Sequence, residues 1–370
     1  MKLAFFNLTC CFLLMFGLAS CQVGRFIFYN FANISDHKKF PARKLSHNHE
    51  AAFKFHLPGN AGKKPKSITL NGKELPFDKF LKQSNTVAFL IIKNDTIQYE
   101  SYQNGYEQES IVASFSMAKS VLSILVGCAI DEGLIQSVEE PITNYVPELA
   151  TRGFERVRIK HLLQMTSGLK FNESYYNPFG DAARYYYGRH LRKYMKQMKL
   201  AKTPGTEFSY TSGNTQLLGL VLERALKNKR VTEYLQEKIW TPLGMEYGGS
   251  WSIDKKKNGM EKTFCCLNAR ARDFAKLGRL YLHKGQWHGN QIVSQKWVEE
   301  STTPDLSEGG VNYYKYQWWL PSDDGDFMAQ GILGQYVYAN PKKDLIIVRL
   351  GKNHGKANWT NIIQGLANFY

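Results

Sequence analysis

The stretch Ser116-Met117-Ala118-Lys119 starts an apolar run over residues 117–130, and this run decides how the rest of the chain is interpreted. A segment that is apolar on nearly every side predicts a helix buried inside the fold. Asp131-Glu132-Gly133 then supplies polar residues and a glycine, which is typical of a helix end. Because residues three apart share one helix face, the Lys119 amine is predicted to reach the Ser116 hydroxyl.

The Ser-x-x-Lys pattern gains its meaning from this place at the first turn of a buried helix. The same spacing occurs at Ser35, Ser167 and Ser252, but in polar loops or before a glycine. A helix N-terminus offers N–H groups and a partial positive charge to a developing oxyanion. Burial should lower the pKa of Lys119, and a neutral amine can take a serine proton. The alternative is a serine helix cap followed by a surface lysine.

A second segment, residues 204–214, is rich in Gly, Ser and Thr and contains Tyr210 just before a predicted helix. A phenol beside an ammonium group is easier to ionise. Tyr210 is therefore predicted to pass a proton to a leaving group. The alternative interpretation is an aromatic side chain that packs a loop.

A third segment, residues 329–335, contains Gly331 and Gly334 and leads into a predicted strand. Glycine in a strand allows a close approach of the backbone to a neighbouring group. A backbone N–H aimed into a pocket here would form half of an oxyanion hole. The alternative interpretation is a β-bulge or a turn.

The pattern around these segments predicts a domain of mixed α/β (α+β) class. Strands are predicted at residues 86–92, 96–102, 335–338 and 345–350. Helices are predicted at residues 159–166, 181–199, 213–228, 230–239, 269–284 and 357–369. Strands near both chain ends, with helices between them, predict one antiparallel sheet built from the two ends, flanked by helices and interrupted by an inserted helical region.

In the order Ser-x-x-Lys, Tyr-x-Ser and glycine-rich strand, the chain resembles the serine β-lactamase and penicillin-binding-protein superfamily. Further matching phrases lie at residues 161–169, 204–206, 241–245 and 271–278. The resemblance covers residues 85–370 and implies a β-lactamase/transpeptidase-like fold, with the site between a sheet domain and a helical region. The chain is most similar to the class C β-lactamase-like hydrolases, which include 6-aminohexanoate-dimer hydrolases and related esterases.

The resemblance also implies roles for individual residues. It implies a nucleophile, its base and a proton relay, which are Ser116, Lys119 and Tyr210 in that order. It implies that the backbone N–H groups of Ser116 and Ile332 form the oxyanion hole. It further implies three substrate contacts, at Tyr175, Ser212 and Gly331.

The chain departs from the family where penicillin-recognising enzymes carry Lys-Thr-Gly. Ala329-Gln330-Gly331 stands there and lacks the cation and hydroxyl that would bind a substrate carboxylate. The departure favours a serine hydrolase that cleaves an ester or amide through an acyl-serine intermediate. The alternatives are a β-lactamase or D-Ala-D-Ala carboxypeptidase, and a non-catalytic binding or sensor protein on the same scaffold.

The first residues predict an exported lipoprotein. Lys2 precedes an apolar run that is short for a membrane span, and Leu18-Ala19-Ser20-Cys21 resembles the bacterial lipobox. Residues 1–20 are then a signal peptide, Cys21 is lipidated, residues 21–84 form an extension or tether, and residues 85–370 form the hydrolase domain. This organisation places the protein at the bacterial cell envelope, with the membrane as partner through the lipid anchor. An ordinary signal peptide or an anchor helix is the alternative.

The charge, the cysteines and a few single residues give further expectations. The formal net charge is +16, but the basic residues are scattered without a nucleic-acid-binding signature, so we expect a basic surface and no nucleic-acid partner. Cys128 is predicted to be a small buried side chain. Cys265 and Cys266 are predicted to be free thiols, and a vicinal disulfide between them is the alternative. No metal site is predicted, and the mechanism needs no cofactor. Arg349 and His354 are assigned structural roles, and contact with substrate is the alternative for both.

Overall fold

The fold is organised around a seven-stranded antiparallel sheet in a computed structural model that describes residues 22–29, 31–59, 62–70 and 72–370. The predicted signal peptide and Cys21 lie outside the described residues. In spatial order the strands are β11 (Tyr314–Lys315), β12 (Trp318–Trp319), β13 (Phe327–Gly331), β14 (Gln335–Asn340), β15 (Leu345–Gly351), β4 (Thr86–Lys93) and β5 (Thr96–Tyr102). Because β15 pairs with β4, the two chain ends share one sheet, as predicted.

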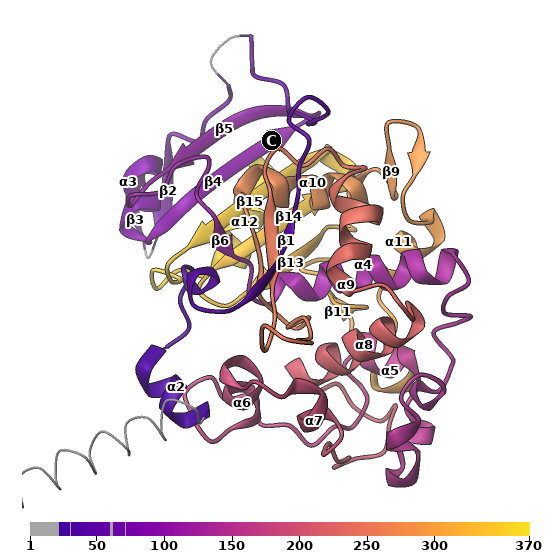
Figure 1. Cartoon of the computed structure of the whole chain (residues 1–370). Helices are drawn as coiled ribbons and strands as arrows, with labels where there is room; N and C mark the ends of the chain where they lie inside the picture. Colours follow the sequence, from indigo (N-terminus) through magenta and orange to yellow (C-terminus); the bar gives the residue numbers. More distant parts are fainter. Residues whose placement is uncertain (1–21, 30, 60–61, 71) are drawn as a thin grey trace, which may run out of the picture.

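Helices cover both faces of this sheet (Figure 1). Leu90 and Ile92 of β4 lie in a hydrophobic cluster with residues of α4 (Met117–Asp131) and α10 (Ala271–Leu282). Phe89 and Ile91, which point the other way, lie in a second cluster with residues of α3 (Phe77–Gln83) and α12 (Trp359–Phe369). Alternate side chains of a strand face opposite sides, so burial of both faces explains the unbroken apolar sequence of β4.

A helical region lies below the sheet in Figure 1. It contains α5 (Ile159–Leu163), α6 (Asp181–Tyr187), α7 (Leu191–Met195) and α8 (Ser212–Ala225). Helices α9 (Val231–Leu235) and α11 (Gln295–Thr302) follow later in the chain. The prediction of one helix over residues 181–199 is wrong, because α6 ends at Gly188. A side chain at Gly188 would collide with the carbonyl oxygen of Arg184, and the glycine leaves the helical conformation there.

Some residues before position 85 pack in the hydrophobic core and pair in a sheet, as a tether would not. β1 (Ala42–Leu45) pairs with β7 (Gly249–Ser252) in a four-stranded sheet that continues through β8 (Leu267–Ala269) to β6 (Val112–Ala113). Ile34, Phe40 and Leu45 are buried in the first cluster. The remaining α-helix and strands of the described residues are α2 (Gln22–Tyr29) and the hairpins β2 (Ser67–Leu70)–β3 (Lys73–Pro76) and β9 (Gln286–Trp287)–β10 (Asn290–Gln291). The domain division between residues 84 and 85 stays a prediction.

The cysteines follow the predictions in part. Cys128 is a buried free thiol, as predicted. The prediction of free thiols at Cys265 and Cys266 is wrong, because a disulfide joins these neighbours. The φ angle of Cys266 is 70°, an uncommon conformation for a residue with a side chain, and adjacency in sequence does not reveal it.

The described residues offer neither a metal cluster nor a membrane-spanning helix. No group of three or more His, Cys, Asp or Glu side chains is placed to hold a metal ion there. None of the helices in the described ranges has the length and apolar character needed to cross a bilayer.

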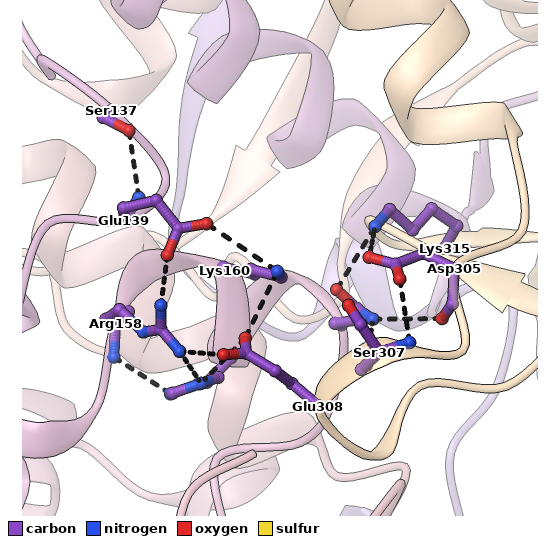
Figure 2. A network of polar contacts seen from close by, with 10 residues as sticks. Ser137, Glu139, Arg158, Lys160, Asp305, Ser307, Glu308 and Lys315 are labelled. Carbon is purple, nitrogen blue, oxygen red and sulfur yellow. Dashed lines mark hydrogen bonds and ion pairs between the residues drawn. The ribbon is translucent and has the colours of Figure 1, made fainter.

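Ion pairs connect the helical region to the segment between α11 and β11 (Figure 2). Arg158, which precedes α5, pairs with Glu308. The neighbouring Gly309 packs against the backbone of Glu207, and a side chain at position 309 would collide with that backbone. The segment that carries Glu308 and Gly309 therefore supports the loop that leads to Tyr210.

Candidate active site

Ser116 is placed by the pairing of β6 with β8. The strands align Ala113 with Asn268, and the Ser114 amide donates to the Leu267 carbonyl oxygen at 2.8 Å. Phe115 then adopts a positive φ of 46°, which costs free energy for a residue with a side chain and is typical of functional sites. The turn sets Ser116 at the start of α4, half-buried at the edge of a cavity.

Lys119 lies one helical turn further and is 1% exposed. Its Nζ is 3.0 Å from Ser116 Oγ, 3.2 Å from Ser212 Oγ and 2.8 Å from the Phe264 carbonyl oxygen. Burial lowers the pKa of Lys119 to about 8, against the opposing effect of the Glu173 charge. The predicted approach of the two side chains and the predicted fall in pKa are both confirmed.

The neighbours of Lys119 offer three acceptors to its Nζ. The Ser212 hydroxyl donates to Glu173 Oε1 at 2.6 Å, so its oxygen accepts from Lys119. The Ser116 hydroxyl oxygen and the Phe264 carbonyl oxygen are the other two acceptors, so an ammonium group can donate to all three. Once the amine has lost its proton, two N–H groups remain for Ser212 and Phe264. The lone pair can then accept the Ser116 hydroxyl proton.

Tyr210 comes to the same point from the loop before α8. Its hydroxyl contacts the Ser116 side chain, and its ring centroid lies 5.2 Å from Lys119 Nζ. Burial raises the pKa of Tyr210 above its ordinary value, although the contact with Ser116 acts in the opposite direction. The expectation of an easily ionised phenol is therefore wrong, because loss of solvation outweighs the neighbouring groups. At neutral pH the Tyr210 hydroxyl keeps its proton.

Glu173 is the site residue that the sequence did not reveal. Its carboxylate accepts from the Ser212 amide at 2.7 Å, from the Ser212 hydroxyl and from the Tyr175 hydroxyl at 2.7 Å. It therefore fixes two of the predicted substrate-contact residues and stands at the N-terminus of α8, where a negative charge is favoured. Its position two residues before Tyr175 was the only hint in the sequence that Glu173 belongs to the site. Its partner Ser212 lies 39 residues away, so the sequence does not show their contact.

The two amides predicted for an oxyanion hole are free to bind a ligand. Ser116 and Ile332 both line the cavity, and neither backbone N–H donates to an acceptor within the described part of the chain. Gly331 makes this arrangement possible. A Cβ at this position would collide with the Ser114 carbonyl oxygen and lie 3.2 Å from the Ser116 nitrogen.

The cavity beside Ser116 has a volume of about 220 Å³ and is mostly apolar. Its lining includes Phe31, Phe115, Tyr175, Tyr176, Tyr186, Phe264, Cys265, Leu333 and His354. No lysine or arginine is among the described residues that line it. His354 also lines the cavity, where the alternative of a substrate contact would place it, and partial burial lowers its pKa.

Arg349, by contrast, is a fully buried structural residue. Its guanidinium donates to the carbonyl oxygens of Ser84, Gly334 and Asn353 and to the Thr86 hydroxyl. These bonds hold the turn after Ile332 against the start of strand β4. Its structural assignment agrees with the observed contacts.

The chain is similar to known hydrolases in sequence and in fold. The Beta-lactamase family model matches residues 77–358. The 6-aminohexanoate-dimer hydrolase of Paenarthrobacter ureafaciens is 30% identical over 294 residues, which cover 73% of each chain. A candidate 6-aminohexanoate-dimer hydrolase from Bacillus anthracis superposes with a TM-score of 0.80 at 23% identity, covering 91% of this chain and 93% of the other. A family VIII carboxylesterase superposes with a TM-score of 0.60 at 17% identity, covering 75% and 89%.

Proposed function

Because this chain belongs to the β-lactamase family, and relatives in that family are named as hydrolases, we propose that it hydrolyses an ester or amide through an acyl intermediate on Ser116. One observation carries the proposal. The buried Lys119 Nζ lies 3.0 Å from Ser116 Oγ at the edge of a cavity, and it has no ion-pair partner in the described ranges. A buried lysine without an ion-pair partner can act as a general base, whereas a lysine on the surface stays a charged ammonium group.

Acylation begins when the Lys119 lone pair takes the Ser116 hydroxyl proton and Oγ bonds to the substrate carbonyl carbon. The carbonyl oxygen gains negative charge, and the amides of Ser116 and Ile332 donate to it. The resulting Lys119 ammonium is stabilised by the Phe264 carbonyl oxygen and by Glu173 acting through the Ser212 hydroxyl.

Tyr210 completes the proton transfers. Its protonated hydroxyl gives a proton to the leaving group as the bond to the acyl carbon breaks, and the Lys119 ammonium returns a proton to the phenolate. Deacylation uses the same groups in reverse, because water enters where the leaving group departed. Water loses a proton to this pair, and Ser116 Oγ regains one as the acid leaves.

The cavity favours a neutral apolar acyl group. Its aromatic lining offers burial to hydrocarbon, and it has no lysine or arginine in its described lining to pair with a carboxylate. A β-lactam or a D-Ala-D-Ala peptide presents such a carboxylate. Ala329 and Gln330 on β13 do not supply a cation either.

A linear amide is the second candidate, because the relative that shares 30% identity is named for hydrolysis of the 6-aminohexanoate dimer. The Tyr175 hydroxyl, held by Glu173 near the cavity, is a polar group that an amide nitrogen can contact. Esters and amides use the same acylation steps, so the preference depends on the leaving group.

A substrate panel tests the proposal. Purified protein is assayed with p-nitrophenyl esters of increasing acyl length, nitrocefin and the linear 6-aminohexanoate dimer. We expect turnover of short and medium esters, little turnover of nitrocefin, and loss of all activity in Ser116→Ala. A preference for nitrocefin would support the β-lactamase alternative. Failure of every substrate, with a correctly folded protein, would support a binding protein.

We also propose that residues 1–20 direct export and that Cys21 carries a lipid, which would place the enzyme at the bacterial cell envelope. The apolar run and the Leu-Ala-Ser-Cys ending support this proposal. Metabolic labelling with an alkyne fatty acid should mark the wild-type protein and not Cys21→Ser. Equal labelling of both would reject lipidation at this cysteine.

A further inference from the structure

Five large apolar side chains are exposed to solvent, and two of them line the cavity beside Ser116. Two lie on α2, one follows α2 and two lie in the loop before α6. They are Ile27, Phe28, Phe31, Tyr176 and Phe179, with exposed fractions between 53% and 82%. Phe31 contacts Tyr176, with ring centroids 5.8 Å apart, and both residues line the cavity beside Ser116. We call these five residues the mouth surface.

Helix α2 has apolar side chains both on the face that packs on the protein and on the face exposed to solvent. Its inner face is fixed, because Phe26 packs on Tyr187 with ring centroids 5.2 Å apart, and α2 lies beside α6 (Figure 1). Ile27 and Phe28 point away from this contact and are 68% and 82% exposed. Clustered exposed side chains of this size are typical of an interaction site.

A basic pocket adjoins the same helix. It has a volume of about 340 Å³ and is bordered by Phe28 and Tyr29. Five basic residues line it, which are Arg25, Lys39, Arg189, Lys255 and Lys256. The acid among its lining residues, Asp254, is 3% exposed and accepts from backbone amides.

Part of this positive charge is uncompensated. No ion pair within the described ranges involves Arg189, Lys255 or Lys256. The pocket therefore presents net positive charge next to exposed aromatic side chains. This combination matches the headgroup and acyl regions of an anionic lipid surface.

We infer that the mouth surface and the basic pocket dock on an anionic phospholipid bilayer, with the cavity opening toward the lipid. The inference rests on the proposed function for its catalytic consequence. Charge complementarity selects this partner, because a second copy of a chain with net charge +16 would bring like charges together. Helix α2, which carries Ile27 and Phe28, begins at Gln22, the residue after the cysteine that we propose to be lipidated.

Docking in this orientation defines a substrate class. A cavity of about 220 Å³ is smaller than typical pockets for drug-sized ligands, which measure about 300–1,000 Å³. It holds a short acyl segment, and the rest of a longer chain would extend past Phe31 and Tyr176 into the bilayer. The enzyme would thus take apolar esters that reside in the membrane.

A crosslinking experiment tests the docking without reference to activity. The full chain is reconstituted in vesicles of equal parts phosphatidylcholine and alkyne-tagged phosphatidylglycerol, with a photoreactive benzophenone residue replacing Phe28. The control position is Asn290, which is exposed on the β9–β10 hairpin at the opposite side of Figure 1. We expect about fivefold or more lipid adduct from position 28 than from position 290, because only the docked face meets acyl chains. Equal adduct at both positions, or a crosslinked dimer in place of the lipid adduct, would overturn the inference.

A kinetic experiment separates docking from catalysis. Lys255→Glu with Lys256→Glu is compared with Lys284→Glu with Lys296→Glu, which makes the same charge change at exposed sites elsewhere. We expect the first pair to lower hydrolysis of a long-chain 4-methylumbelliferyl ester in these vesicles by about fivefold or more at low salt. Hydrolysis of soluble p-nitrophenyl acetate should be unchanged in both variants.

The outcomes of the kinetic experiment are distinct. Equal loss with both variant pairs, or no loss with either, would overturn docking while leaving the hydrolase proposal intact. Failure of the wild-type protein on the soluble ester and on every ester and amide of the substrate panel would instead reject the proposed function.

Discussion

Replacing Glu173 by Gln should shift the pH dependence of catalysis toward lower pH. The carboxylate reaches Lys119 through the Ser212 hydroxyl, with contacts of 2.6 and 3.2 Å. The charges are therefore at most about 6 Å apart, a range at which they interact by about 1.5 to 3 kcal/mol at effective dielectric constants of roughly 40 and 20. This energy corresponds to about 1 to 2 pKa units. The carboxylate favours the ammonium, so its loss lowers the pKa of Lys119 further below about 8.

The assay is kcat/KM for p-nitrophenyl butyrate between pH 5.5 and 9.5. Since the neutral amine is the base, activity rises with pH through the Lys119 pKa, and the rise should move down by about 1 to 2 units in Glu173→Gln. The plateau should also fall, because Ser212 and Tyr175 lose their shared acceptor. Glu207→Gln, which removes an exposed carboxylate paired with Lys202, is the matched control. An unmoved rise, or one displaced to higher pH, would refute the reasoning.

Three further predictions concern neighbouring groups. Tyr210→Phe should lower kcat by about 10²–10⁴-fold, as for loss of a general acid, and an unchanged kcat would remove Tyr210 from the mechanism. Gly331→Ala should reduce kcat far more than it raises KM, because its methyl group collides with the backbone before the nucleophile; steady-state kinetics with normal circular dichroism checks this. Reducing the Cys265–Cys266 disulfide with a phosphine should lower kcat about threefold or more, because the Phe264 carbonyl that orients the base adjoins it. The double serine variant should be insensitive to the phosphine, and equal kcat before and after reduction of the wild type would contradict this role.

Local patterns account for what the sequence predicted correctly. The pairing of Ser116 with Lys119 follows from helix geometry alone, since the two residues lie one turn apart. The strands β4, β5, β14 and β15 follow from short apolar runs bounded by turn residues. In each case the information lies within a few positions of the residues concerned.

Long-range contacts account for what the sequence left out. Glu173 binds Ser212 across 39 positions, and β1 pairs with β7 across some 200 positions, so neither contact has a local signature. The pKa of Tyr210 was predicted in the wrong direction because burial depends on the whole fold. The break at Gly188 was missed because apolar residues continue on both sides of it.

The central claim is that Ser116 carries the acyl group, and mass spectrometry of the fluorophosphonate-treated protein tests it most directly. The account predicts one adduct per chain, located on the peptide that contains Ser116 and absent from Ser116→Ala. Ser123→Ala, which removes a buried hydroxyl of the same helix, should label normally. An adduct that persists in Ser116→Ala, or that maps to another residue in the wild type, would contradict the account.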